Sequence, residues 1–600
     1  MSKYAVRSAP PSEIEQGLLN HSPLVRQLLY SRGLTTPELA EGFLNPSYES
    51  HSHDPFSMKD MEKAVERILR AVKNDERIAI FSDYDADGIP GAVVLHDFFK
   101  RIGYLNFENY IPDRHGEGFG LNNSAIQQLK ASEVKLLITI DCGITDIEEV
   151  ARANELGMDV IITDHHLPLR EGIENTEYRI ENNQQRKELL PPAFAILNPK
   201  QSDCAYPEKM LCGSGVIFKL IQALCRRLRS GLEFGNWNLE IPKAILTTEW
   251  ERWLLDMVGL ATLSDMVPLT GENRVFAYYG LKVLKKSPRR GLNELLSILR
   301  LNRADLTEDD IGFSITPRIN AASRMGHPMD AFRLFATVEE HEAVELAKHL
   351  DKINTERKGK VASLVREVRR HVEERGQCKV VVAGNPNWRP ALLGLVANSL
   401  AEDMRCPVFL WGREESIELK GSCRAGGSVD LSLMMHEARA VFSDFGGHKE
   451  AGGFSTTLEK VHLLESELER AYEKLRQTRS DLSQPDLIAD AVLSFDDVND
   501  RTWQDIAKLA PFGIGNPKPV FLFENARIRR LEQFGKEKQH LKLVFAKTDG
   551  VWVNAIRFYA KPEDFPSALM EGRPVNLLAH LERSTFGNKT ELRLRIVDII

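Results

Sequence analysis

The sequence has little of what marks a secreted, disulfide-stabilised or membrane protein. Its 600 residues include only seven cysteines, with no CxxC pair and no zinc-ribbon spacing. This excludes a disulfide scaffold and indicates reduced thiols. No apolar run approaches the roughly 20 residues needed to cross a bilayer, and the first residues lack the apolar core of a signal peptide. We therefore expect a soluble, cytoplasmic protein with no membrane partner.

A net positive charge is also missing. The chain has 78 Lys and Arg against 86 Asp and Glu, a formal charge of −8. A uniformly basic coat protein for nucleic acid is excluded, and any phosphate polymer has to be met by local basic patches. The hydrophobic fraction of 42% and the charged fraction of 27% are ordinary for a globular protein. A chain of this length is too long for one hydrophobic core and predicts three to five domains.

Changes of pattern along the chain predict an α/β protein. From about residue 77, apolar runs alternate with amphipathic segments, which is typical of a parallel sheet with crossover helices. A predicted helix over 339–375 would span roughly 55 Å. The end of the chain is rich in strands and turns, as a small β-barrel is. We expect an N-terminal helical extension (1–70), a parallel-sheet α/β domain (71–335), a long connecting helix (336–376), a smaller α/β domain (377–482) and a C-terminal barrel (483–600).

Three predicted strands of the first α/β domain end in acidic residues. The carboxyl ends of parallel strands lie along one edge of a sheet, where ligands bind, so we expect these side chains to crowd one crevice. Such a cluster repels itself unless cations lie between the carboxylates. The residues are Asp83, Asp85 and Asp87 after the first strand, Asp141 after the second, and Asp164, His165 and His166 after the third.

Carboxylate oxygens with one or two imidazoles suit Mn²⁺ or Mg²⁺ better than Zn²⁺. Two such ions can activate a water and hold a phosphoryl group, which indicates hydrolysis of a phosphodiester or phosphoanhydride. Two other interpretations compete with a metal site. A calcium-binding EF-hand fits the spacing Asp83-x-Asp85-x-Asp87-Gly88 but requires a glutamate where Val94 stands. A single aspartate at a strand end is more often a cap than a ligand, and the repetition on three strands favours a metal site.

These motifs carry a family resemblance. DYDADG at 83–88, IDCG at 140–143 and TDHH at 163–166 resemble the DHH phosphoesterase superfamily, and GSCR at 421–424 and FGGHKEAGG at 445–453 resemble its DHHA1 companion domain. Further motifs resemble the single-stranded-DNA-specific 5′→3′ exonucleases of that superfamily, in which the terminal barrel is an OB fold. They are PDRHGEGFGLN at 112–122, TLSDMVPLTGENR at 262–274, PRINAASR at 317–324 and PFGIGNPKPVF at 511–521.

The resemblance implies an enzyme of DNA repair and recombination that releases mononucleotides from a 5′ end with two Mn²⁺ or Mg²⁺ ions. Its implied partners are single-stranded DNA, a single-strand binding protein and a helicase, and the implied state is a monomer. One alternative is an enzyme for short RNAs or cyclic dinucleotides, but such relatives lack this length and the OB region. The other is a non-catalytic replication scaffold, which would be expected to have lost the acidic ligands that this chain keeps.

The resemblance also implies roles at the metal site. Asp85 and Asp87 would each hold one metal and Asp141 would bridge both. His165 would ligate one metal, with a further carboxylate from Asp265. Three neighbours would support this set: Asp83 as an additional ligand, His166 by facing the phosphate or by orienting the ligands through hydrogen bonds, and Asp164 by fixing the histidine pair.

The implied substrate-binding residues lie further along the chain. Arg324, Ser422 and Arg424 would grip the terminal 5′ phosphate, because forked guanidinium donors fit phosphate oxygens. Their implied neighbours are Arg318, Asn320, Gly446, Gly447 and His448, the glycines by letting backbone N–H groups approach phosphate. The chain departs from the family pattern at Pro90, Ser323 and Arg389 to Ala391.

The predicted barrel interleaves basic and aromatic residues, as a single-strand-binding groove does, where stacking is worth roughly 1–3 kcal/mol per base. Some of the aromatics must be core, and alternating charge on strand faces is ordinary. The basic residues are Arg527, Arg529, Arg530, Lys536, Lys538, Lys542, Arg583, Lys589, Arg593 and Arg595, and the aromatic ones are Phe534, Phe545, Trp552, Phe558 and Phe586.

Overall fold

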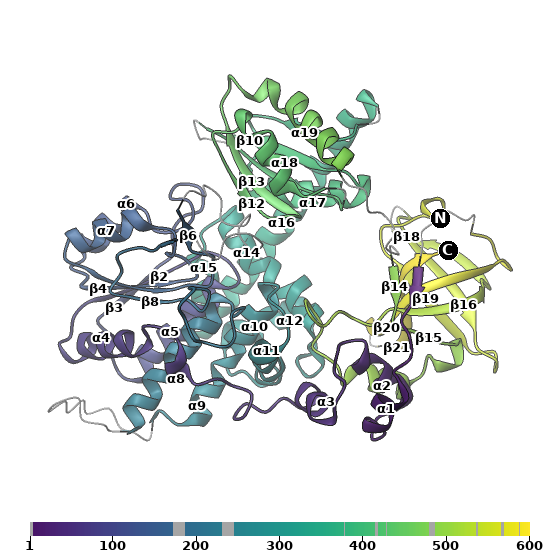
Figure 1. The fold of residues 1–600 in the computed structure, drawn as a ribbon, viewed down its shortest axis with the longest axis horizontal. Helices are drawn as coiled ribbons and strands as arrows, with labels where there is room; N and C mark the ends of the chain where they lie inside the picture. The colour runs from purple at the N-terminus through teal and green to yellow at the C-terminus, as the bar shows by residue number, and fades with distance from the viewer. Residues whose placement is uncertain are drawn as a thin grey trace. The chain divides into compact units, whose positions relative to one another are not determined.

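The computed structural model of the chain divides into two units (Figure 1). One unit comprises Met1–Ser52, Pro268–Tyr278 and Asp481–Ile600, and the other comprises His53–Val267 and Tyr279–Ser480. We call them the barrel unit and the catalytic unit. The described residues are 4–171, 187–230, 245–376, 378–413, 418–427, 429–478, 487–535, 538–565, 569–586 and 589–600, except the side chains of 585, 586 and 589.

The catalytic unit begins with the predicted parallel sheet. Its five strands lie in the order β3 (Phe107–Tyr110), β2 (Ile78–Ser82), β4 (Leu136–Ile140), β5 (Asp159–Thr163) and β8 (Ala195–Leu197), and all neighbours are parallel. Every residue of β2 and β4 is buried, as expected for strands covered on both faces. One face carries α6 (Asn123–Ala131) and α7 (Ile147–Glu155), and the other carries α4 (Met61–Lys73), α5 (Gly88–Arg101) and α8 (Gly213–Ser230) (Figure 1).

A helical layer continues the catalytic unit. It includes α9 (Thr248–Trp253), α10 (Leu255–Ser264), α12 (Arg290–Leu299), the π-helical turn η4 (Ile311–Ile315), α14 (Thr316–Met325) and α15 (Met329–Ala336). The long helix is present as predicted, as α16 (Glu340–Arg375). It ends at Gly376, whose φ of +87° an L side chain rarely adopts. Leu346 and Leu350 are buried in its first half, and Val368 packs into the smaller α/β domain.

The smaller α/β domain is present as predicted, and its sheet is mixed. Its strand order is β12 (Asp444–Gly447), β13 (Ala451–Thr456), β11 (Leu419–Arg424), β10 (Val408–Gly412) and β9 (Val381–Gly384), and only β9 and β10 are parallel. The helix α17 (Pro390–Met404) packs on one face, and α18 (Leu431–Glu437) and α19 (Leu464–Thr478) pack on the other.

The barrel unit is built on a seven-stranded mixed sheet. Its order is β15 (Ala491–Val492), β16 (Phe521–Arg527), β20 (Pro574–Phe586), β21 (Lys589–Ile599), β19 (Trp552–Arg557), β18 (His540–Ala546) and β17 (Arg530–Phe534). The first helices of the chain belong to this unit: Val25 and Leu28 of α2 (Pro23–Tyr30) and Leu44 of α3 (Pro37–Leu44) share one core with Phe521 and Phe545. The strand β1 (Tyr4–Val6) pairs in parallel with β14 (Leu487–Ala489).

A segment from the middle of the chain is bound into the barrel unit. Arg274 is 2% exposed, and its guanidinium donates to the carbonyls of Phe43, Leu509 and Ala510 at 2.6–3.2 Å. The buried Asn516 donates to the carbonyls of Leu509 and Pro511, both at 2.8 Å. The Leu269 N–H donates to the Ile514 carbonyl at 2.7 Å. The PFGIGNP motif therefore holds the segment 268–278, and we call this arrangement the clasp.

Candidate metal centre and phosphate site

Backbone hydrogen bonds place the acidic residues along one edge of the parallel sheet. The N–H groups of Asp83, Asp141 and Asp164 donate to the carbonyls of Ile140, Thr163 and Leu197, respectively, at 2.9–3.1 Å. The hydrogen bonding between neighbouring strands thus extends one residue beyond each strand and fixes the backbone position of each aspartate. Asp141 has a φ of +63°, a conformation that costs free energy in a non-glycine residue and often marks a functional site.

Two glycines make room for the carboxylates. A Cβ added to Gly213 would lie 2.6 Å from the Cβ of Asp141, and one added to Gly88 would lie 2.4 Å from the carbonyl oxygen of Asp83. Both contacts are shorter than real Cβ atoms make. Any larger residue at either position would push the acidic loops apart.

The structure brings all the predicted ligands into one cluster. The Nε2 of His165 lies 3.1 Å from a carboxylate oxygen of Asp141, 3.6 Å from Asp265 and 3.8 Å from Asp87. Candidate ligand atoms lie within 4.8 Å of one another in three overlapping groups. The groups are Asp83, Asp85 and Asp141; Asp87, His165 and Asp265; and Asp141, His165 and His166. Asp265, at the end of α10, joins them from outside the sheet.

Hydrogen bonds hold three of these side chains in place. The Asp87 carboxylate accepts from the N–H groups of Gly213 and Ser214 at 2.6 and 2.7 Å, at the start of α8. The Asp85 carboxylate accepts from the N–H of Asp87 at 2.8 Å. Asp164 accepts from the N–H groups of both histidines and from Nδ1 of His166 at 2.8 Å. The predicted supporting role of Asp164 fits these bonds.

The cluster is electrostatically unfavourable without cations. Burial and the Asp85 charge raise the pKa of Asp83, and burial and the Asp87 charge raise the pKa of Asp141 and of Asp265. Burial and the Asp85 charge raise the pKa of Asp87 to about 6. Buried oxygens of Asp83 and Asp141 also lack a hydrogen-bond partner among the described residues. Orphaned carboxylate oxygens facing one another fit hard divalent cations.

The two histidines differ in charge. Burial and the neighbouring His166 lower the pKa of His165 to about 3, so its ring is neutral and can offer a lone pair to a metal. Partial burial disfavours the charged form of His166, but Asp164 outweighs this effect and raises its pKa to about 9. His166 is therefore a cation at neutral pH. Because its Nδ1 is bonded to Asp164, Nε2 is the nitrogen left to face a phosphate.

These pKa shifts predict how stability depends on pH. Groups with raised pKa values lose their stabilisation as pH rises, which applies to the cluster carboxyls and to His166 with its folded pKa of about 9. His165 has the opposite effect, because its pKa is lowered in the folded state. That effect ends above about pH 6.5, the reference pKa of histidine. The melting temperature of EDTA-treated protein should fall by roughly 5 °C between about pH 6.5 and 8.5.

Differential scanning fluorimetry measures this effect. Saturating Mn²⁺ should remove most of the decline, and Asp141→Asn should make it shallower without metal. A melting temperature that stays level or rises over this range in EDTA would contradict the electrostatic description of the cluster.

The predicted phosphate-gripping residues gather at the start of α17. Nη1 of Arg324 donates to the carbonyl of Ala391 at 2.5 Å. A Cβ on Gly394 would lie 3.2 Å from Nη2 of Arg424 and 3.5 Å from Oγ of Ser422. Burial and the nearby Arg114 and Arg357 lower the pKa of Arg324 to about 9. Cations pressed together in this way favour an anion among them.

The other predicted substrate residues are more dispersed. Asn320 reaches the metal loop, where its side-chain oxygen accepts from the N–H of Ala86 at 3.0 Å. Arg318 instead pairs with Asp351 of α16 at 2.8 Å. Gly446 and Gly447 lie in β12, and a Cβ on Gly447 would lie 2.4 Å from Cα of Gly452, so strand packing alone explains that glycine. His448 is exposed beyond the strand.

The departures from the family pattern leave the cluster unchanged. Pro90 lies in the first turn of α5, where proline is tolerated. Ser323 is 1% exposed and donates to the Asn320 carbonyl at 3.3 Å. Arg389 is the N-cap of α17, and Pro390 and Ala391 form its first turn.

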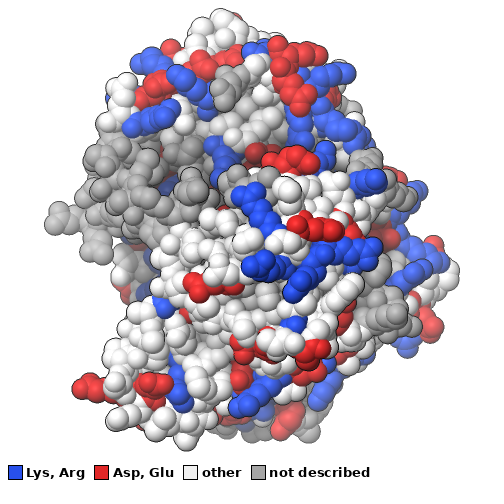
Figure 2. Space-filling view, turned by 90° about the vertical axis from the view of Figure 1, so that its right-hand side faces the viewer, with Lys and Arg blue, Asp and Glu red and all other residues white. Residues whose placement is uncertain are grey.

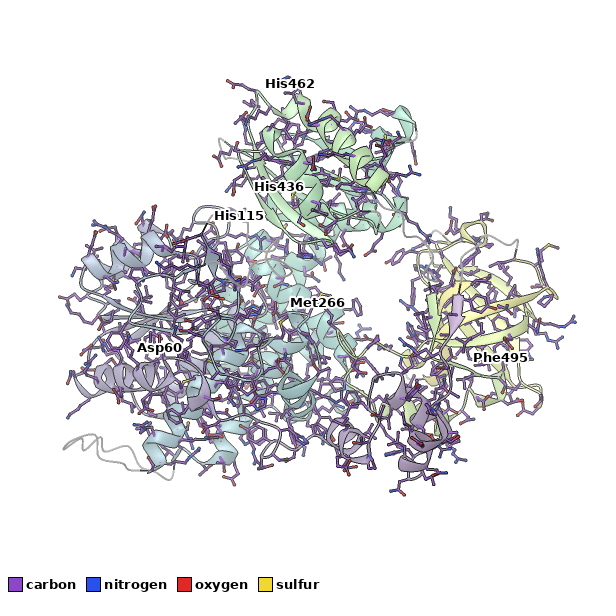
Figure 3. All side chains as sticks on the ribbon, in the orientation of Figure 1. Asp60, His115, Met266, His436, His462 and Phe495 are labelled. Carbon is purple, nitrogen blue, oxygen red and sulfur yellow. The ribbon has the colours of Figure 1, made fainter. Side chains whose placement is uncertain are left out.

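Residue-level reasoning missed a loop beside the cluster. The guanidinium of Arg114 lies 4.8 Å from the ring centre of Tyr84, and the ring of Phe119 lies 5.8 Å from that of His166. Asp146 anchors this loop by accepting from the N–H of Leu121 at 2.7 Å. The motif at 112–122 was the available signal, but it indicated only a family likeness. Figure 3 labels His115 of this loop and Met266, the exposed residue after Asp265.

The barrel residues divide between core and surface. Phe545 is buried and Trp552 is 62% exposed. Phe534 and Phe558 are half-buried, and the centre of each ring lies 5.1 Å from that of His540 and 6.1 Å from the other. Arg595 lies 4.3 Å from the ring centre of Phe558. Several cations have carboxylate partners: Arg530 and Lys542 with Glu532, Arg583 with Asp500, and Arg593 with Glu582.

Arg527, Arg529 and Lys538 are exposed. Figure 2 shows a band of basic side chains across the middle of the face it presents, with acidic ones beside it. Lys536 lies outside the described residues, and so do the side chains of Phe586 and Lys589.

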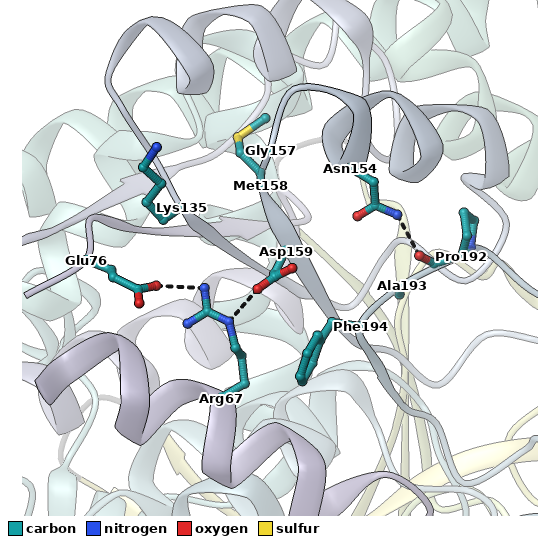
Figure 4. Close-up of a pocket in the computed structure, with 10 residues that line it drawn as sticks. All are labelled: Arg67, Glu76, Lys135, Asn154, Gly157, Met158, Asp159, Pro192, Ala193 and Phe194. Atoms are coloured by element: carbon teal, nitrogen blue, oxygen red, sulfur yellow. Dashed lines mark hydrogen bonds and ion pairs between the residues drawn. The ribbon is translucent and has the colours of Figure 1, made fainter. Parts of the chain in front are cut away.

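A cavity of about 610 Å³ lies at the opposite, amino edge of the parallel sheet (Figure 4). Its central charge, Arg67, is bonded to Glu76 at 2.7 Å and to Asp159 at 2.6 Å. These groups satisfy one another, so the cavity does not resemble the acidic cluster in chemistry.

None of the helices among the described residues is long and apolar enough to span a membrane.

Comparisons with known proteins give a consistent result along the chain. Family models match the DHH family N-terminal domain at 77–248, the DHHA1 domain at 377–478 and the RecJ OB domain at 489–598. The single-stranded-DNA-specific exonuclease RecJ of Bacillus subtilis is 33% identical over 588 residues, covering 97% of this chain and 68% of the relative. The RecJ exonuclease of Haemophilus influenzae is 28% identical over 622 residues, covering 100% of this chain and 99% of the relative.

A solved structure extends the likeness to the fold. The crystal structure of RecJ from Thermus thermophilus in complex with Mn²⁺ matches with a TM-score of 0.76 at 24% identity, covering 100% of this chain and 79% of that one. The predicted fold class and the family resemblance are confirmed.

Proposed function

Because the chain belongs to the RecJ family of single-stranded-DNA-specific exonucleases, we propose that it removes mononucleotides from the 5′ end of single-stranded DNA at the acidic cluster. The observation that supports this most directly is the grouping of Asp83, Asp85 and Asp141 with Asp87, His165 and Asp265. The proposed cofactors are two Mn²⁺ or Mg²⁺ ions. When bound, such ions activate a water for attack on phosphorus and neutralise charge on the phosphate.

The chain's own residues would then divide the work. Asp141, which belongs to two of the ligand groups, would lie between the two ion positions. Asp85 and Asp87 would each hold one ion, Asp265 and His165 would complete the set, and Asp83 would support it. Protonated His166 would donate from Nε2 to an oxygen of the scissile phosphate, while Asp164 keeps its ring in place.

The polarity would come from the arginines around α17. Arg324 and Arg424, with the hydroxyl of Ser422, would bind the terminal 5′ phosphate, because charge-assisted bonds to guanidinium favour a phosphate dianion. Holding the terminus beside the cluster places one particular phosphodiester at the metals. Asn320, Arg318, Gly446, Gly447 and His448 remain candidates for contacts to the same strand.

Further proposals concern the setting of the enzyme. We propose that it acts as a cytoplasmic monomer in repair and recombination, with a single-strand binding protein and a helicase as partners. The barrel, from about 483 onward, would bind single-stranded DNA through its exposed basic and aromatic residues. We also propose that the long helix, at about 336–376, divides the catalytic unit into the parallel-sheet domain before it and the smaller α/β domain after it.

One experiment tests the activity and its direction. Oligonucleotides labelled at the 5′ or the 3′ end are incubated with the protein in Mn²⁺ or in EDTA. The expected result is early release of the 5′ label as a mononucleotide in Mn²⁺ only. Release from the 3′ end would overturn the polarity, and cleavage of dinucleotides or short RNAs in preference to DNA would favour the rejected alternative.

A further inference from the structure

A fourth strand of the parallel sheet ends beside the acidic residues, although it contributes no acid of its own. The strand β8 pairs in parallel with β5, and Leu197 lies opposite Thr163. The carboxyl ends of neighbouring parallel strands share one edge of the sheet. The turn Asn198-Pro199-Lys200, which follows β8, therefore lies next to the motif at 163–166.

Hydrogen bonds fix this turn and connect it to the histidine pair. Asn198 is fully buried, and its side-chain amide donates to the carbonyl of His166 at 2.8 Å. The side-chain oxygen of Asn198 accepts from the N–H of Lys200 at 2.8 Å. The side chain of Gln201, which is 2% exposed, donates to the carbonyl of Ile196 at 2.9 Å. Buried side chains before and after Lys200 thus hold its backbone in place.

The ammonium of Lys200 acts on the cluster, and its side chain is half-buried. Burial and the neighbouring His166 lower the pKa of His165, and the charge of Lys200 lowers it further. Asp164 is adjacent to His165 in the chain, but it raises that pKa by less than Lys200 lowers it. Burial raises the pKa of Asp265, and the charge of Lys200 opposes that rise. The ammonium therefore lies close to the His165 ring and on the side of Asp265.

A fixed cation at this place suits the proposed reaction. Attack on a phosphodiester builds up negative charge on the phosphate oxygens, and the carboxylates of the cluster disfavour that charge. Donors that are already held in position stabilise it without reorganising, and an ammonium binds phosphate as a compact point charge. His166 is one cation at the ends of β5 and β8, and Lys200 is a second.

We propose that the ammonium of Lys200 binds a non-bridging oxygen of the phosphate that is cleaved, and that Lys200 is a catalytic residue alongside His166. The proposal rests on the proposed nuclease function, because that phosphate belongs to its substrate. Water gives its hydroxyl to phosphorus and its proton to the 3′ oxygen of the terminal nucleotide, whose bond to phosphorus breaks. Lys200 keeps its own proton throughout and stabilises the charge on the phosphate.

The test compares Lys200→Met with the unaltered chain in single-turnover cleavage of a 5′-phosphorylated dT oligonucleotide at saturating Mn²⁺. Methionine removes the charge at a similar side-chain length. The rate of the first cleavage should fall by roughly 10- to 100-fold, the effect of losing a hydrogen bond to a charged group. Lys200→Arg keeps the charge and should recover most of this loss. A rate within threefold of the unaltered one in Lys200→Met would overturn the proposal.

Lys135→Met is the matched control. Lys135 is an exposed lysine that precedes β4, at the opposite edge of the same sheet. The control removes the same charge far from the cluster, and it should cleave within twofold of the unaltered rate. An equal loss in Lys135→Met would mean that net charge accounts for the effect, and the proposal would be wrong.

Mn²⁺ binding separates a contact to substrate from support of the metal ligands. Titration without DNA, followed by electron paramagnetic resonance, measures the affinity. Because Lys200 is a cation beside these ligands, its removal should leave the affinity unchanged or make it tighter. If Lys200 only held His165 in place, Lys200→Met would bind Mn²⁺ more weakly. A fall in affinity large enough to account for the lost rate would overturn the proposal.

A modified substrate identifies which phosphate Lys200 binds. A methylphosphonate at the second linkage removes the charge of the neighbouring phosphate and leaves the first linkage intact. Lys200→Met should lose as much rate on this substrate as on the ordinary one. If the loss disappears, Lys200 binds the neighbouring phosphate, and the assignment to the cleaved phosphate is wrong.

The same measurements keep this proposal distinct from the proposed function. Cleavage of DNA from the 5′ end at an equal rate with and without Lys200 would overturn the role of Lys200 alone. Preferred cleavage of a short RNA or a dinucleotide, with the expected loss in Lys200→Met, would overturn the proposed function alone. A chain that cleaves no phosphodiester in Mn²⁺ would overturn both.

Discussion

Replacing Asp141 with asparagine should lower the rate of single-strand cleavage by roughly 1,000-fold or more, the scale at which removal of one essential charge-stabilising group acts. Asp141 contributes to two of the three ligand groups, and no other carboxylate of the described cluster does so. The change keeps the size of the side chain but removes the charge that holds the cations. Initial rates on a 5′-labelled oligonucleotide in Mn²⁺ measure the effect.

The same variant has a readout that does not depend on activity. Titration of Mn²⁺ followed by electron paramagnetic resonance should show fewer tightly bound ions than in the unaltered chain. The matched control is Asp203→Asn, an exposed carboxylate of the catalytic unit that pairs with Lys59. Full cleavage by Asp141→Asn, or loss of Mn²⁺ binding in the control, would refute the assignment of Asp141.

Replacing Arg424 with alanine should abolish the preference for a 5′-phosphorylated end. A hydrogen bond to a charged group is worth about 1.5–3 kcal/mol, so kcat/KM on 5′-phosphorylated DNA should fall by roughly 10- to 100-fold. On DNA with a 5′ hydroxyl the variant should differ little from the unaltered chain. The ratio of kcat/KM values on the two substrates is the measurement.

Lys420→Ala is the control on the same strand. Lys420 is an exposed cation of β11, four residues before Arg424. The Lys420→Ala variant removes the same unit of charge but leaves Arg424 and Ser422 beside α17 unchanged. This variant should keep the preference for a 5′ phosphate. If Arg424→Ala loses equal activity on both substrates, Arg424 supports the fold or the DNA path and does not read the terminus.

The parallel sheet and the carboxylates at its edge were predictable because local signals determine them. Apolar runs define β2, β4 and β5, and the acids follow directly in the sequence. A parallel sheet then brings its strand ends together regardless of how the rest of the chain folds. The long helix was predictable for a similar reason, since only Gly359 interrupts its helix-forming residues and that glycine has open space around it.

Residues that depend on distant packing were not predictable in this way. The sequence shows Arg318 within a family motif, but only the fold reveals that Asp351 of the long helix is its partner. The motif around Gly447 predicts a phosphate contact, and the approach of β13 gives that residue a second reason to be glycine. Asp265, alone on its helix, has no local pattern to distinguish it from a capping residue. The resemblance supplies it, and its role stays a prediction.

The first helices of the chain illustrate the same limit. Their short apolar pattern predicts a helical extension and gives no indication of what it packs against. In the structure, Val25 and Leu28 lie in the core that also contains Phe521 and Phe545. Contacts between residues from opposite ends of the chain leave no periodic trace in a single sequence.

The clasp has a consequence for how the protein is made. Residues 1–52 and the segment 268–278 leave the ribosome long before residues 481–600, with which they form one unit. The side chain of Arg274 finds the carbonyls of Leu509 and Ala510 only after more than 200 further residues have been translated. The catalytic unit can fold while synthesis continues, whereas the barrel unit has to wait for the last part of the chain. A shortened chain that begins at the barrel strands would lack two of the three segments that make up this unit.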